Sequence, residues 1–144
     1  MKNQASEICG EVKKIYDWLD SQLADAADKC TACGNCCDFA RFGHRLFVTT
    51  PELLYFKNNI KNFLPMRTGV CPYMKNNKCT AREFRFASCR IFFCKADEEF
   101  QNKISEQAVK DFKQICDKYQ LFYQYIDLKQ ALCIKALRLY IVAL

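Results

Sequence analysis

The chain has 144 residues, including 11 cysteines and one histidine, and carries a formal net charge of +6. Its length predicts one domain, 1–144, with enough core to fold without disulfides, since a domain of about 150 residues buries roughly 70% of its unfolded surface. No run approaches the roughly 18 apolar residues of a membrane span, and the N-terminus lacks the apolar stretch of an export signal. The composition therefore argues against a membrane protein and against a secreted disulfide framework, and it predicts a cytoplasmic chain.

The first predicted element is an amphipathic helix over residues 3–28. Its apolar residues recur at helical spacing between polar ones, and they are Ile8, Val12, Ile15, Tyr16, Leu19 and Leu23. This helix leads directly into the cysteine-rich stretch that begins at Cys30. Beyond that stretch, residues 41–48 (RFGHRLFV) have a strand-like end.

A short helix is predicted next, ending at about Asn59. Thr49 or Thr50 suits its N-cap, and Pro51 suits its first turn. Glu52 lies three residues after Thr49, which is the spacing of a capping box. The start of this helix is therefore specified by neighbouring residues alone.

A tight turn is predicted at Asn76 and Asn77, which would bring Cys71 and Cys79 together. From about Ile104 to the end, the spacing predicts two helices. The apolar face of the first is Ile104, Ala108, Phe112, Ile115 and Tyr119, and that of the second is Leu121, Tyr125, Leu128, Leu132, Ala136, Leu137 and Tyr140. The predicted fold is a mainly α single domain, with helices packed around an irregular cysteine-rich metal-binding centre.

Eight cysteines form one block at 30–94: Cys30, Cys33, Cys36, Cys37, Cys71, Cys79, Cys89 and Cys94. CxxC spacing places pairs of sulfurs on a tight turn, and in a reducing compartment such clusters indicate metal or redox chemistry rather than disulfides. His44 is the only histidine, which excludes sites built on several imidazoles. Eight sulfurs suit two tetrathiolate sites, and with two dications bound their charge would leave the chain at roughly +2.

The identity of the metal stays open among zinc, an iron–sulfur cluster and Cu(I), which all suit a soft ligand set. Two zinc sites usually draw on paired CxxC knuckles, and the second half of the block has none. A CxxCxxC run together with a remote cysteine followed by proline, here Cys71 and Pro72, echoes the ligand spacing of bacterial 4Fe–4S proteins. The spacing therefore favours iron–sulfur, with zinc as the alternative.

The stretches CTACGNCC (30–37) and CPYMKNNKCTAREFRFASCRIFFC (71–94) resemble the YkgJ-type family, a zinc- or iron-chelating domain with a CxxCxxCC signature. The second half of the family's pattern is kept at Cys71, Pro72, Cys79, Arg85, Cys89, Arg90, Phe92 and Cys94. The chain departs from it where Arg82 replaces a tyrosine and where Phe86 and Phe93 replace prolines. The resemblance covers residues 30–94 and implies metal chelation by all eight cysteines.

Three classes of function are compatible with this resemblance. The first is a metal-binding protein that handles metal or electrons. Flagellin lysine methylases look like larger members with the same cluster, so an enzyme that transfers a group to protein side chains is the second. The third is a structural-zinc adaptor for protein or nucleic acid. The expected partners are metal ions and, for the alternatives, a protein partner or substrate; nucleic acid is disfavoured, and no membrane is expected.

Basic and aromatic residues alternate over residues 81–95 (AREFRFASCRIFFCK). Such a surface can stack bases and bind phosphates, but we favour a role around the metal. There Arg85 and Arg90 would offset thiolate charge, while the phenylalanines exclude water. The remaining cysteines are assigned to packing on apolar helical faces, and these are Cys9, Cys116 and Cys133. His44 is assigned to a structural or surface role.

Overall fold

The computed structural model describes residues 2–24, 37, 46–92 and 97–132. Helices account for about 62% of this part of the chain, in agreement with the predicted mainly α class. The helices are α1 (Lys2–Gln22), α4 (Thr50–Asn59), the 3-10 helix η2 (Arg82–Phe84), α5 (Ala87–Ile91), α6 (Glu98–Tyr119) and α7 (Leu128–Ala131). Two small antiparallel sheets pair β1 (Phe47–Thr49) with β4 (Tyr125–Asp127), and β2 (Met74–Lys75) with β3 (Lys78–Cys79).

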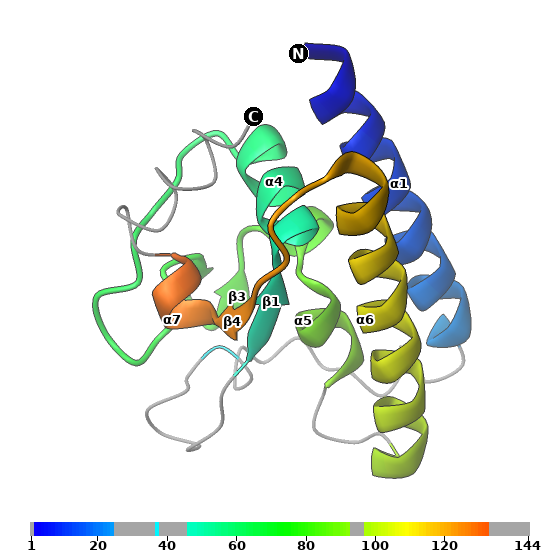
Figure 1. The fold of residues 1–144 in the computed structure, drawn as a ribbon. Coiled ribbons are helices and arrows are strands. Elements are labelled where there is room, and N and C mark those ends of the chain that lie inside the picture. Colours follow the sequence, from blue (N-terminus) through cyan, green and yellow to red (C-terminus); the bar gives the residue numbers. More distant parts are fainter. Residues whose placement is uncertain (1, 25–36, 38–45, 93–96, 133–144) are drawn as a thin grey trace.

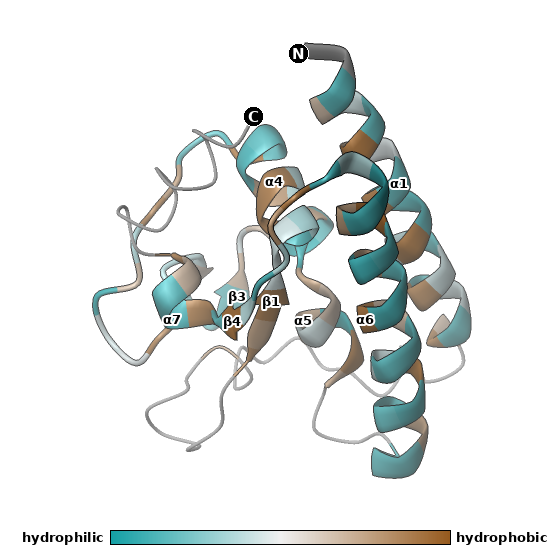
Figure 2. Cartoon of the chain, viewed as in Figure 1, coloured by the Kyte–Doolittle hydropathy of each residue, from teal (hydrophilic) through white to brown (hydrophobic). Residues whose placement is uncertain are grey.

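Helices α1 and α6 lie side by side and run in opposite directions (Figure 1). At one end of the pair, the Gln4 amide donates a hydrogen bond of 3.3 Å to the Tyr119 carbonyl, and Lys118 pairs with Glu11 at 2.7 Å. The outer face of α6 is hydrophilic, whereas its inner face is apolar (Figure 2). The amphipathic pattern predicted for each helix therefore explains why α1 and α6 pack against each other.

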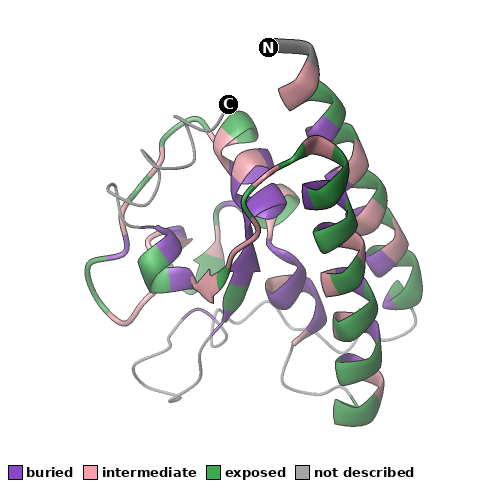
Figure 3. Cartoon of the chain, viewed as in Figure 1, coloured by how far each residue is buried: buried purple, intermediate pink, exposed green. Residues whose placement is uncertain are grey.

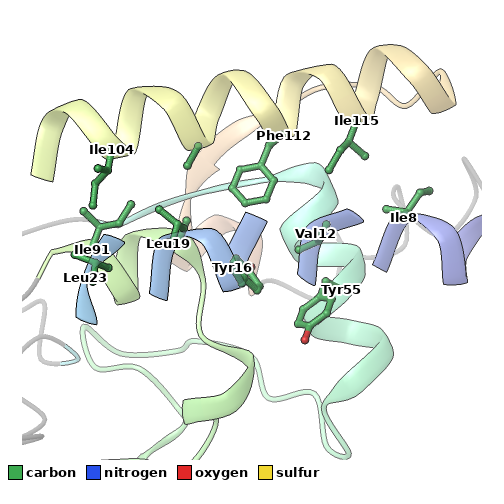
Figure 4. Packing of buried hydrophobic residues seen from close by; sticks show 12 residues of the cluster. Ile8, Val12, Tyr16, Leu19, Leu23, Tyr55, Ile91, Ile104, Phe112 and Ile115 are labelled. Carbon is green, nitrogen blue, oxygen red and sulfur yellow. The ribbon is translucent and has the colours of Figure 1, made fainter. Parts of the chain in front are cut away.

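The apolar faces of these helices meet in a first core cluster (Figure 4). From α1 and α6 it contains Ile8, Val12, Tyr16, Leu19, Ile104, Ala108, Phe112 and Ile115, and it also takes in Leu23, Tyr55 of α4, and Ala87 and Ile91 of α5. The rings of Tyr16 and Phe112 pack edge to face at 6.1 Å between centroids. This confirms the predicted apolar face of each helix, although residues 25–28 of the predicted first helix lie outside the described ranges.

The predicted capping box at the start of α4 is present. The backbone N–H and the hydroxyl of Thr49 each donate a hydrogen bond of 2.9 Å to Glu52 Oε2. Pro51 occupies the first turn, and the helix ends at Asn59 as predicted. Thr49 is also the last residue of β1, which confirms the strand-like end of residues 41–48; residues 41–45 lie outside the described part.

A second core cluster is formed by α4, β1, α7 and the segments around the β2–β3 hairpin, which lie on the side of α4 away from α1 and α6 and are largely buried (Figures 1 and 3). Its buried members are Leu46, Val48, Leu53, Phe56, Met66, Tyr73, Ala81, Phe86, Leu128, Ala131 and Leu132. Helix α4 contributes to both clusters, since Tyr55 faces the first and Phe56 the second. Within the described ranges, no helix is long and apolar enough to cross a membrane.

Two predictions for the C-terminal third need correction. Helix α6 begins at Glu98, earlier than Ile104, because Asp97 caps it by accepting a hydrogen bond of 3.0 Å from the Glu99 N–H. The helix predicted from Leu121 is wrong over residues 121–127, which are extended and include strand β4. The Thr50 hydroxyl donates to the Phe122 carbonyl at 2.8 Å, and β1 supplies the partner strand. Residues 133–144 of this predicted helix lie outside the described part.

Gln120, which ends α6, provides a stability test. It has a left-handed backbone with φ of 55°, and its neighbour Leu121 closes the helix through a hydrogen bond of 2.9 Å to the Cys116 carbonyl. Because a residue with a Cβ is strained in this conformation, Gln120→Gly should raise the free energy of unfolding by about 0.5–1 kcal/mol in urea titrations. Gln114→Gly in the exposed interior of α6 is the matched control and should lower it by about 1 kcal/mol. A loss of stability in both variants would contradict the assigned cap.

Candidate metal centre

Four of the eight predicted ligands lie in the described part of the chain, namely Cys37, Cys71, Cys79 and Cys89. Cys37 is buried, and the other three are half-buried beside the second core cluster. The predicted ligands outside the described residues are Cys30, Cys33, Cys36 and Cys94, and His44 lies there too. The geometry below therefore concerns half of the predicted ligand set.

Cys37 and Cys71 are in contact, although they belong to the two separate halves of the cysteine pattern. The Cys71 N–H donates a hydrogen bond of 2.8 Å to the Cys37 carbonyl. The Cys37 side chain is hydrogen-bonded to the Cys71 sulfur, and this bond lowers the pKa of the Cys71 thiol below its ordinary value, against the opposing effect of burial. The fold thus joins one sulfur from each half of the pattern.

The turn that follows Cys71 directs backbone amides toward its sulfur. The Met74 N–H donates a hydrogen bond of 3.1 Å to the Cys71 carbonyl, and the backbone N–H groups of Tyr73 and Met74 near the Cys71 sulfur add to the lowering of its pKa. Tyr73 is itself held in place, because its hydroxyl accepts a hydrogen bond of 2.7 Å from the Leu64 N–H and donates one of 3.0 Å to the Asn62 carbonyl. Amides that face a sulfur stabilise the thiolate, which is the form that binds metal.

The hairpin places Cys79 near Cys71, as the sequence predicts. Asn76 and Asn77 both have positive φ, 54° and 62°, which is the conformation of a two-residue turn between antiparallel strands. Met74 lies opposite Cys79 in the strand register, and the Thr80 N–H donates to the Tyr73 carbonyl at 2.8 Å. The charge of Cys79 is close enough to Cys71 to oppose the lowering of its pKa.

Arg85 lies within electrostatic reach of two of the sulfurs. Burial and the neighbouring positive charges of Arg82 and Arg90 lower the pKa of Arg85, while Cys89 and Cys79 act in the opposite direction. Its Nε donates a hydrogen bond of 3.1 Å to the Arg82 carbonyl. This position suits the predicted role of Arg85, which is to offset thiolate charge.

Arg90, the other predicted supporting residue, is buried and holds the backbone around Cys89. Its guanidinium contacts both carboxylate oxygens of Asp20, at 3.1 and 2.8 Å, and lies 4.3 Å from the Tyr16 ring centroid. It also donates to the carbonyls of Arg85 and Glu83, at 2.9 and 2.8 Å. The segment between Cys79 and Cys89 is therefore tied to α1 through Arg90.

Asp20 and Tyr16 were not predicted to support the centre. On α1, Tyr16 fits an ordinary core position and Asp20 an ordinary solvent-facing one, so their spacing carries no signal of a shared partner. That partner is revealed only by the packing of α1 against α5, which lies far along the chain. Asp20 remains half-exposed, whereas the Arg90 side chain is only 7% exposed.

Two of the three cysteines assigned to packing lie in the described residues, in positions that suit that role. Cys116 is buried in α6, and burial raises the pKa of its thiol to about 11. Cys9 is half-buried against the first core cluster, and its sulfur accepts a hydrogen bond of 3.4 Å from the Asn58 amide. Cys133 lies outside the described residues. Raised pKa values keep Cys116 and Cys9 protonated and so disfavour them as ligands.

The donor set fits a soft metal, since it consists of thiols, one of them with a lowered pKa, with a nearby guanidinium and backbone amides. Among the residues that the structure describes, no three side chains of His, Cys, Asp or Glu gather closely enough to hold an ion.

A pocket of about 260 Å³ lies between α1 and α6. It is lined by residues such as Glu11, Lys14 and Gln114 and by no cysteine.

Comparisons with protein-family models, with curated proteins and with solved structures find no match to this chain. The resemblance of the cysteine pattern to the YkgJ-type family therefore stays a prediction. The described residues establish the mainly α fold.

Proposed function

We propose that this protein binds a metal centre, an iron–sulfur cluster or zinc, through the thiolates of its eight clustered cysteines, and that it handles metal or electrons. The observation that carries the proposal is the contact between Cys37 and Cys71. One belongs to the CxxCxxCC run and the other to the CP motif, so a site shared by the two halves of the pattern requires such a contact.

Three further features of the described residues support the proposal. Backbone amides face the Cys71 sulfur, the Asn76–Asn77 turn brings Cys79 near it, and Arg85 adds positive charge beside Cys79 and Cys89. Each feature serves a thiolate centre. The turn brings two sulfurs together, the amides favour the deprotonated form of Cys71, and the guanidinium balances the negative charge. The likeness of the pattern to the YkgJ-type family points the same way.

The metal is identified by elemental analysis and an absorption spectrum of protein purified without oxygen. We expect bound iron with sulfide and a brown absorption near roughly 400 nm if the cysteines hold a cluster. A colourless protein with stoichiometric zinc would show that the metal is zinc and not a cluster, and the thiolate site would still stand. A folded, metal-free chain whose cysteines are joined as disulfides would overturn the proposal.

A further inference from the structure

Glu52 is a carboxylate buried between helices, only 2% exposed, whose role extends beyond its capping box. Its Oε2 accepts the two hydrogen bonds from Thr49 already described. Its Oε1 accepts one of 2.6 Å from the Ala87 N–H and one of 3.3 Å from the Tyr16 hydroxyl. A single side chain thus connects the start of α4 with α1 and with the first residue of α5.

Helix α5 depends on such contacts because it has five residues, Ala87–Ile91, and so short a helix is not stable by itself. The residue at its N-cap, Phe86, makes no side-chain capping bond. The Glu52 carboxylate, which comes from another helix, satisfies the Ala87 N–H in its place. The Ser88 hydroxyl adds a bond of 2.9 Å to the Phe47 carbonyl. Cys89, a predicted ligand, is the next residue of this helix.

We propose that Glu52 is a positioning residue for the metal centre, whose carboxylate anchors α5 and thereby fixes where the Cys89 sulfur lies. The inference rests on the proposed function, because it gives Cys89 the role of a ligand. It adds to that function a buried group outside the cysteine pattern on which the ligand geometry depends.

The hydrogen-bond geometry explains why a carboxylate is needed at this position. Every polar group that contacts Glu52 is a donor, and both carboxylate oxygens accept. Burial raises the pKa of Glu52, and the four donors act against that rise. Glutamine has the same shape but only one acceptor oxygen, so its NH₂ group must face either the Ala87 side or the Thr49 side. Either orientation sets donor against donor at one end of the network.

The test compares the wild type with Glu52→Gln by two measurements. The first is the rate at which iodoacetamide alkylates each cysteine of the metal-free, reduced chain, followed by peptide mass mapping. We define the Cys89 ratio as the alkylation rate of Cys89 divided by that of Cys71 and Cys79. In Glu52→Gln we expect this ratio to rise about fivefold or more, which is the factor that the loss of one hydrogen bond corresponds to. The second is Zn²⁺ affinity by chelator competition, which should fall about 10- to 100-fold.

Two further variants keep the test decisive. Ile8→Val loosens the same core cluster at the end far from Ile91 of α5 and should leave the Cys89 ratio unchanged (Figure 4). If Glu52→Gln does not fold, Ala87→Pro removes the N–H that bonds to Glu52 and keeps the Glu52 carboxylate. Proline is favoured at the first helical position, and the extended backbone of Phe86 is compatible with it. Ala87→Pro should also raise the Cys89 ratio.

An unchanged Cys89 ratio in Glu52→Gln would overturn the inference. Glu52→Gln could instead raise the alkylation rates of all cysteines equally, as in Ile8→Val. That result would overturn the inference as well, because Glu52 would then act only on global stability. If the wild type binds neither zinc nor iron, the proposed function fails, and the positioning of Cys89 by Glu52 is still decided by the alkylation ratio. The two failures are therefore distinguishable.

Discussion

We expect Cys89→Ser to release the metal of the proposed centre and to lower the free energy of unfolding of the metal-loaded protein by several kcal/mol, on the order of 3 or more. A serine hydroxyl stays protonated at neutral pH and is a harder ligand than a thiolate, so the centre loses one strong bond. The unfolded chain has no assembled thiolate site, so metal binding stabilises only the folded state. A weaker metal affinity therefore lowers the free energy of unfolding as well. Metal content after gel filtration and urea unfolding of the metal-loaded protein measure the two effects. Cys33→Ser should behave in the same way.

The matched control is Cys9→Ser, which exchanges the same atoms in a half-buried cysteine assigned to packing. Its metal content should equal that of the wild type, because a serine oxygen still accepts from the Asn58 amide and no ligand is removed. Cys133→Ser should likewise keep the metal. If Cys33→Ser and Cys89→Ser both retain full metal content, the ligand assignment is wrong. If Cys9→Ser loses metal, the division between ligand and packing cysteines is wrong.

Arg90→Ala is the second substitution with a large expected effect, a loss of about 2–4 kcal/mol in the free energy of unfolding. It leaves the carbonyls of Arg85 and Glu83 without their donor and removes the cation from the Tyr16 ring. Asp20 is half-exposed, so water can solvate its carboxylate after the change, which limits the loss. Arg90→Lys should rescue little, because an ammonium group cannot span a carboxylate and two carbonyls at once. Urea unfolding measures both variants.

An exposed ion pair on α1, the helix that carries Asp20, supplies the comparison for Arg90. Lys13 pairs with Asp17 at 2.9 Å, and both side chains are more than half-exposed. Lys13→Ala should therefore lower the free energy of unfolding far less than Arg90→Ala does, because water screens an exposed pair. If Arg90→Ala were no more destabilising than Lys13→Ala, Arg90 would not be the buried tie between α1 and the segment before Cys89. Retention of the metal by an Arg90→Ala chain that still folds would limit its role to stability.

The structure confirms three kinds of local signal in the sequence. The capping box at Thr49, the turn at Asn76 and Asn77, and the apolar faces of α1 and α6 are all present. Each depends on residues within about four positions of one another, so the physical cause lies within the segment that displays it. The assignment of Cys116 to packing succeeded for the same reason, because its place on the apolar face of α6 follows from spacing.

The failure at residues 121–127 had a nonlocal cause. Their apolar spacing is compatible with a helix, but Val48 lies opposite Ile126 in an antiparallel pair, and Thr50 bonds to the carbonyls of Phe122 and Gln124. Strand β1 has only three residues and needs a partner for its backbone groups. Pairing with a distant segment therefore overrode local preference, which no window along the chain could have revealed.

The sequence by itself determined the apolar faces of α1 and α6, the capping box of α4 and the Asn76–Asn77 turn, because these depend on neighbouring residues. Only the tertiary structure decided that Cys37 meets Cys71, that Glu52 anchors the helix of Cys89, and that Arg90 joins Asp20. Those contacts form between segments far apart in the chain, and the burial of two core clusters on either side of α4 selects them.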